Sequence, residues 1–200
     1  MIDGALLSYV GVMSVTPGPN NLLLAASGVH FGIRRTLPHL FGISLGHFTQ
    51  VFLVTLAFGA VVGLFQGVRP WLALVGCSYL LWLSWKIFRA GVPEEKEGRQ
   101  PMGFFEAALF QAINPKAWVM VVNIALLFTP RDLDPVIGAL GLGAVCAVVN
   151  LPCVAVWALT GDRLRRVLSR GRAALVFNGL MGGLMAGTAL WLLVEELVKL

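Results

Sequence analysis

The sequence predicts an all-α membrane protein with six transmembrane helices. We expect two inverted three-helix repeats, with the first and fourth helices broken. The 200 residues are 58% hydrophobic and only 12% charged, whereas soluble domains carry about 25% charged residues. The charges are also clustered, so that long apolar stretches alternate with short polar ones. Two proline-and-asparagine interruptions lie inside apolar stretches, one in each half of the chain.

Six apolar segments follow each other along the chain, and a transmembrane helix needs about 20 residues. The third segment is short, but it lengthens if Lys86 and Arg89 reach toward the membrane surface. The expected spans are 4–29, 37–68, 70–85, 104–130, 134–161 and 173–194. They make one transporter domain over 1–200, with repeat halves 1–90 and 104–200 and a cytoplasmic linker at 91–103.

The distribution of basic residues predicts the orientation in the membrane. With six spans, the loops on one side hold eleven Lys and Arg and the other side holds three. The side rich in Lys and Arg is cytoplasmic in most membrane proteins, so both termini are expected outside a bacterial inner membrane. The net charge of +5 is explained by this asymmetry and does not indicate nucleic-acid binding. Three spans in each half mean that the halves enter the membrane in opposite directions, as in many secondary transporters.

The first interruption is Thr16-Pro17-Gly18-Pro19-Asn20-Asn21. Proline removes a backbone donor and breaks the helix before it, and broken backbone inside a membrane is tolerated only next to protein or a water-filled cavity. The N–H groups of the helix that starts at Pro19 suit a carboxylate, and the freed carbonyls suit an ammonium group or a cation. A simple proline kink is the structural alternative, but it does not require two prolines around a glycine.

The second interruption is Asn114-Pro115-Lys116. An ionisable residue inside a span costs at least about 2.5 kcal/mol on insertion scales and marks a functional site by default. The alternative for Lys116 is a side chain that extends to the cytoplasmic surface. Broken helices in corresponding halves are the best pointer to a transporter's binding site. The predicted substrate-binding residues are therefore Pro17, Gly18, Pro19, Asn20, Asn21, Asn114, Pro115, Lys116 and, near a further proline, Asn150.

Two residues are candidates for proton coupling. His47 lies inside the second span and can exchange protons near neutral pH, although a lone histidine also serves helix packing. Glu106 lies near the cytoplasmic end of the fourth span.

No nucleotide, metal or catalytic motif is found, so we expect no enzyme activity and no cofactor. Four G-x-x-x-G patterns indicate helix packing, mostly within the chain, and leave room for a homodimer. They begin at Gly42, Gly59, Gly179 and Gly183.

The chain resembles the LysE/RhtB family of bacterial amino-acid exporters along essentially its whole length. The resemblance rests on the two interruptions, on Gly42-x-x-x-Gly46, and on Gly76-Cys77-Ser78-Tyr79-Leu80 with Trp85-Lys86 and Ala117. It implies an inner-membrane efflux protein for amino acids or close derivatives, driven by the proton gradient. The alternatives are an exporter of another small solute or cation, or a membrane thiol-disulfide relay protein. The relay is disfavoured because no cysteine lies at either interruption.

Overall fold

The computed structural model describes residues 4–89, 100–130, 132–168 and 172–198, and all regular secondary structure in these ranges is helical. The predicted all-α class is therefore confirmed for the described chain. Both extreme termini, and residues 90–99 of the repeat boundary and linker, lie outside the described residues. The elements are α1 (Gly4–Val15), α2 (Pro19–Phe31), α3 (Ile33–Leu56), α4 (Phe58–Phe88), α5 (Phe104–Phe110), the 3-10 helix η1 (Gln111–Ile113), α6 (Pro115–Phe128), α7 (Pro135–Leu168) and α8 (Arg172–Leu197).

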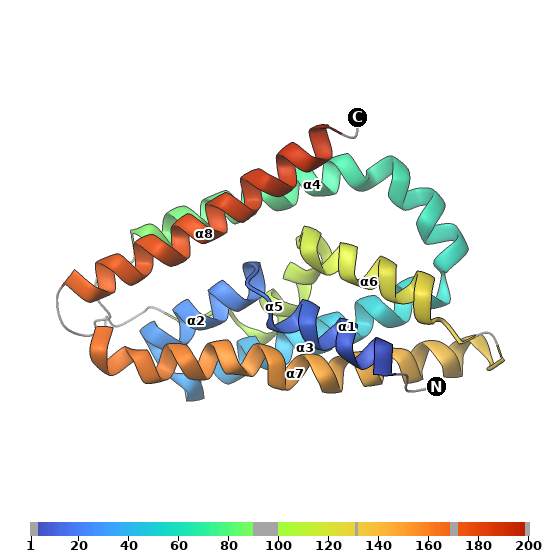
Figure 1. Ribbon diagram of the computed structural model, residues 1–200, viewed down its shortest axis with the longest axis horizontal. Coiled ribbons are helices and arrows are strands. Elements are labelled where there is room, and N and C mark those ends of the chain that lie inside the picture. Colours follow the sequence, from blue (N-terminus) through green and yellow to red (C-terminus); the bar gives the residue numbers. More distant parts are fainter. Residues whose placement is uncertain (1–3, 90–99, 131, 169–171, 199–200) are drawn as a thin grey trace.

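The helices pack as two groups that meet at the broken helices. α3 lies along α7, and α4 lies along α8 as a second layer (Figure 1). One buried apolar cluster joins α1 and α6 to α3 and α7, while another joins α2 and α5 to α4 and α8. α1 and α6 lie toward one end of the molecule, and α2 and α5 toward the other (Figure 1). Both breaks therefore lie between the two clusters.

Several helices have the length and composition of membrane spans. These are α3, residues Pro135–Arg165 of α7 and Arg172–Glu195 of α8, and α5 with α6 forms a fourth span bent by 72°. α1 and the segment Ala73–Phe88 of α4 are apolar but shorter. The described residues thus contain three or four candidate spans of a multi-pass membrane protein, and the count of six remains a prediction.

The predicted boundary between the second and third spans was wrong, because the structure has no helix end at that position. We expected the second span to extend to residue 68 and a loop at Arg69, but α3 ends at Leu56 and α4 continues from Phe58 through Arg69 and Pro70. Arginine is a good helix former, so a single charge does not end a helix. Proline inside a helix is a common place for a kink at which the helix bends and continues, and α4 is curved in Figure 1.

The glycine patterns fall into two classes. Gly42 and Gly46 of α3 lie directly against backbone carbonyls of α5, so that even one added methyl group would clash. They confirm close packing within the chain, as expected for small residues in membrane helices. In contrast, Gly179, Gly183 and Gly187 of α8 have no atom within 4 Å of an added Cβ. A homodimer through that face remains a prediction.

Candidate functional site

The first break separates α1 from α2 and leaves several carbonyl groups without helical partners. Gly18 is extended, with φ −178° and ψ 176°, and Pro19 begins α2. The Asn21 amide donates hydrogen bonds of 2.8 Å to the carbonyls of Ser14 and Thr16. The Trp157 indole of α7 donates to the carbonyl of Val15 over 3.0 Å. Side chains from α2 and α7 therefore stabilise an opened backbone.

The second break lies between η1 and α6. Asn114 adopts extended backbone there, and its side chain accepts a 3.2 Å hydrogen bond from the amide of Lys116 as the N-cap of α6. Trp118 donates to the carbonyl of Ala112 over 2.8 Å. Gly76 of α4 approaches the carbonyl of Ile113 so closely that no side chain fits. This contact explains the glycine at the start of the Gly76-Cys77-Ser78-Tyr79-Leu80 motif in the third predicted span.

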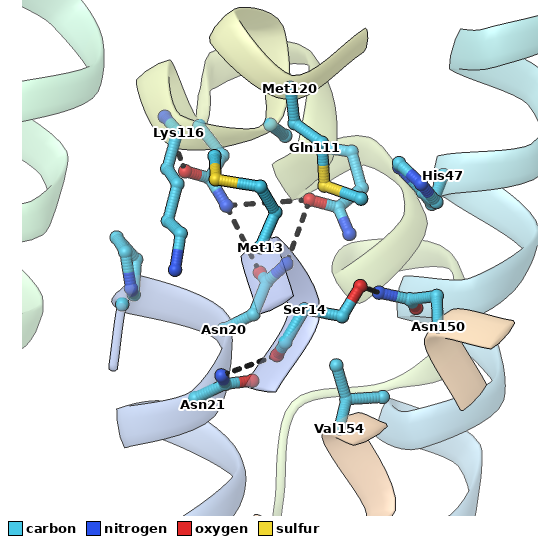
Figure 2. A pocket seen from close by; sticks show the side chains of 14 residues that line it. Met13, Ser14, Asn20, Asn21, His47, Gln111, Lys116, Met120, Asn150 and Val154 are labelled. Atoms are coloured by element: carbon cyan, nitrogen blue, oxygen red, sulfur yellow. Dashed lines mark hydrogen bonds between the residues drawn. The ribbon is translucent and has the colours of Figure 1, made fainter. Parts of the chain in front are cut away.

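The two breaks are joined by a triangle of side-chain amides. The Asn20 amide donates to Gln111 Oε1 over 3.1 Å, and the Asn114 amide donates to Asn20 Oδ1 over 3.2 Å and to Gln111 Oε1 over 3.4 Å. Figure 2 shows Asn20 and Gln111 pointing toward each other, with Lys116 on one side and Met13 in front. Residues about 90 positions apart in the sequence thus form one polar centre.

Lys116 makes a second connection between the breaks. Its Nζ donates to the carbonyl oxygen of Thr16 and to Thr16 Oγ1, both over 2.9 Å, and to the carbonyl oxygen of Pro17 over 3.1 Å. We call these three oxygens the carbonyl cage. The ammonium of α6 therefore binds the freed carbonyls of the first break, which is the cation chemistry expected of them.

Gln111 is the main residue that the sequence analysis missed. It is buried, and its side-chain amide donates to the backbone carbonyl of Ile43 over 3.2 Å. The side-chain amide of Gln50 donates to the backbone carbonyl of Gln111, also over 3.2 Å. It thereby attaches the second break to α3. The available signal was a polar residue inside the fourth apolar segment, three positions before Asn114.

A small polar cavity lies where the breaks meet. Its volume is about 30 Å³, which exceeds the roughly 10–15 Å³ that a cavity needs to hold one water molecule. Three buried polar atoms of lining residues have no partner among the described residues: Asn21 Oδ1, His47 Nε2 and Asn150 Oδ1. Because unpartnered buried polar atoms are costly, the cavity is suited to a polar guest. Its walls are Met13, Ser14, Gly18, Pro19, Asn20, Asn21, His47, Gln111, Asn114, Lys116, Ala117, Met120, Asn150 and Val154.

Most of the predicted site residues meet at this cavity. Pro17 and Pro115 are not among the lining residues, although Pro17 contributes a carbonyl to the cage and Pro115 begins α6. His47 reaches the cavity from α3, and the Asn150 amide donates to Ser14 Oγ over 2.9 Å from α7. Glu106 is the exception. It is exposed in the first turn of α5 and accepts a long 3.4 Å hydrogen bond from the amide of Gly103.

The described residues contain no group of three His, Cys, Asp or Glu side chains that could hold a metal ion. Cys77 and Cys146 are buried in different apolar clusters, and Cys153 is partly buried. None of them lines the cavity.

Comparison with known proteins gives a consistent result. The family model described as LysE type translocator matches residues 11–196. A cysteine/O-acetylserine efflux protein of Klebsiella pneumoniae subsp. pneumoniae is 31% identical over 198 residues, which cover 96% of both chains. Proteins of the same name from Salmonella typhi and Escherichia coli O1:K1 / APEC are 28% and 25% identical. Those matches cover 83% and 82% of this chain and 85% and 84% of the relatives. No solved structure is significantly similar.

Proposed function

Since the chain belongs to the LysE type translocator family, we propose that it exports small amino acids such as cysteine and O-acetylserine across the bacterial inner membrane. Membership in the family confirms the resemblance drawn from the motifs and makes the chain a transporter of small molecules, not an enzyme. The observation that carries the proposal is the hydrogen-bonded meeting of two broken helices around one small cavity with polar side chains in its wall.

The proposed substrate site recognises the zwitterion that amino acids share. The N-terminus of α2, after Pro17, Gly18 and Pro19, carries a partial positive charge and serves the substrate carboxylate together with the Lys116 ammonium. The substrate ammonium is served by side-chain oxygens and freed carbonyls around the breaks. The side-chain oxygens come from Asn20, Asn21, Asn114 and Asn150. Pro115 contributes by fixing the start of α6.

The remaining wall of the cavity supports a small and uncharged substrate side chain. It is apolar, and Lys116 is the one residue carrying a full charge among the residues that line the cavity. A charge on the substrate side chain, in addition to those of the zwitterion, would be buried without a partner, which is costly. A cavity of about 30 Å³ is also too small for an amino acid in this conformation, so binding must widen it. The apolar wall consists of Met13, Ala117, Met120 and Val154.

We further propose six spans in two inverted repeats that alternate access to the cavity from the two sides. This arrangement is supported by the pairing of α3 with α7 and of α4 with α8, which hold equivalent places in the two halves. The imbalance of eleven to three basic residues supports termini that face outward.

We also propose that export is coupled to proton antiport through His47. It is buried, it lines the cavity, and its Nε2 has no partner among the described residues. Glu106 is the weaker candidate because it lies away from the cavity walls.

Export from proteoliposomes tests the proposed function. Purified protein is reconstituted into vesicles loaded with radiolabelled cysteine, O-acetylserine, lysine or glutamate, and efflux is followed at neutral and at acidic external pH. We expect cysteine and O-acetylserine to leave these vesicles faster than they leave protein-free vesicles. Their efflux should be faster still when the exterior is acidified. Lysine and glutamate should be retained. The proposal is wrong if no amino acid leaves faster than from protein-free vesicles.

A further inference from the structure

The carbonyl cage has the chemistry of an ammonium-binding site. An ammonium group has three N–H donors, and Lys116 places all three on Thr16 O, Thr16 Oγ1 and Pro17 O at 2.9 to 3.1 Å. The two carbonyls are available because the extended backbone at Gly18 interrupts the helix, so the amides four residues further on do not reach them. In this conformation Lys116 therefore has no donor left for a substrate carboxylate.

The cage borders the cavity and lies close to further acceptors. Gly18 and Lys116 both line the cavity, as do Asn21 and Asn150, whose side chains are only 3% and 5% exposed. The Oδ1 atoms of these two asparagines have no partner among the described residues. The side of the cavity near the cage thus offers oxygen acceptors to a cationic group, and no acidic side chain lines it.

We propose that the Lys116 ammonium and the substrate's α-ammonium occupy the carbonyl cage in turn. When the substrate binds, its ammonium takes the cage, and Lys116 swings out to bind the substrate carboxylate. The departure of Lys116 also removes side-chain atoms from the cavity edge, so that the cavity widens as the substrate enters. This inference rests on the proposed function only in naming the competing ligand as an amino acid.

The opposite possibility is a permanent tie, in which Lys116 stays in the cage throughout transport and holds the breaks together. The two ideas predict opposite effects of a free primary ammonium ion on a variant that lacks the lysine amine. If the cage is exchanged, the free ion competes with the substrate ammonium. If the tie is permanent, the free ion substitutes for the missing amine and restores substrate binding.

Gly18 offers an independent way to remove Lys116 from the cage while keeping its charge. Its φ of −178° is extended backbone that alanine adopts without strain. An added Cβ would lie 2.7 Å from Lys116 Cδ and 2.9 Å from Nζ, so the flexible lysine end must move away. A ligand's apparent affinity falls by the fraction of protein that is competent to bind it. Gly18→Ala should therefore bind substrate more tightly than the wild type.

The experiment uses purified full-length protein and methylammonium as the probe, with tetramethylammonium, which has no N–H donor, as the control ion. We expect methylammonium, and not tetramethylammonium, to raise the melting temperature of Lys116→Met and to leave the wild type unchanged. Methylammonium should also lower any binding of radiolabelled L-cysteine to Lys116→Met, and Gly18→Ala should bind L-cysteine at least about twofold more tightly than the wild type.

Three results would overturn the exchange. They are an equal response of Lys116→Met to both ions, restored cysteine binding on adding methylammonium, and unchanged or weaker cysteine binding by Gly18→Ala. If Lys116→Met does not fold, the Gly18→Ala measurement decides alone. If the wild type binds no amino acid, the proposed function fails, while the melting measurement with the two ions still tests the cage.

Discussion

Replacing Asn114 by alanine removes two kinds of interaction from the second break. The side-chain oxygen caps α6 through the amide of Lys116. The side-chain amide donates to Asn20 of the first break and to Gln111 beside it in the second break. Loss of an N-cap costs about 1 kcal/mol, and an interhelical hydrogen bond in a membrane protein contributes about 0.6 kcal/mol. With two such hydrogen bonds the sum is about 2 kcal/mol, which shifts the folding equilibrium about 30-fold.

Asn114→Asp separates these two effects. Aspartate keeps an oxygen that can cap α6 but has no amide to donate to Asn20 and Gln111. We expect Asn114→Ala to insert into membranes and to melt at a lower temperature. It should export amino acids about sevenfold more slowly than the wild type, because two hydrogen bonds of about 0.6 kcal/mol each are lost where the breaks join. Asn114→Asp should recover part of the thermal stability, through the cap worth about 1 kcal/mol, without recovering transport.

The measurements are thermal unfolding of the purified variants and efflux of labelled cysteine from proteoliposomes. Wild-type transport by Asn114→Ala would refute the claim that the amide triangle joins the breaks for function. Full transport by Asn114→Asp would show that the cap alone matters.

Three further predictions concern other parts of the site and its packing. If His47 carries the proton, His47→Gln should flatten the pH dependence of efflux while substrate exchange stays measurable, and an unchanged pH profile would exclude it. Gly28 of α2 lies against the carbonyl of Ala158 in α7, so Gly28→Ala should destabilise the protein by about 1–3 kcal/mol in thermal unfolding. Gly179→Ala is the matched control, with no atom within 4 Å of the new Cβ. It should melt no lower than the wild type, because alanine is the better helix former. Met120→Ala enlarges the apolar wall and should add larger uncharged amino acids such as leucine to the exported set; a substrate range unchanged in efflux competition would place the side chain elsewhere.

The sequence analysis identified the breaks because proline and asparagine act locally. Proline removes a donor wherever it stands, so the interruptions at Pro19 and Pro115 follow from residue type alone. That they share one site was expected, because broken helices in corresponding halves mark a transporter's binding site. The tertiary partners were beyond reach, because nothing in the sequence says that Gln111 contacts Ile43 or that Lys116 binds the carbonyls of Thr16 and Pro17.

The misplaced boundary near Arg69 has a related cause. A gap in hydropathy marks where a polar side chain interrupts an apolar run, but the backbone needs no loop there. Arginine and the residues around it remain compatible with a helix, and α4 continues through this position.

The central claim is that the two breaks together bind the zwitterionic backbone of an amino acid, and it is tested most directly by comparing cysteine with its decarboxylated counterpart, cysteamine. Cysteamine brings a second positive charge to Lys116 without a carboxylate to neutralise it. Two such charges about 4 Å apart repel by roughly 4 kcal/mol at an effective dielectric constant of about 20. Efflux from proteoliposomes of the wild type should be at least about 100-fold slower for cysteamine than for cysteine. That factor corresponds to about 2.8 kcal/mol, which is less than the repulsion. Equal efflux of the two compounds, or normal cysteine efflux by Lys116→Ala, would contradict the account.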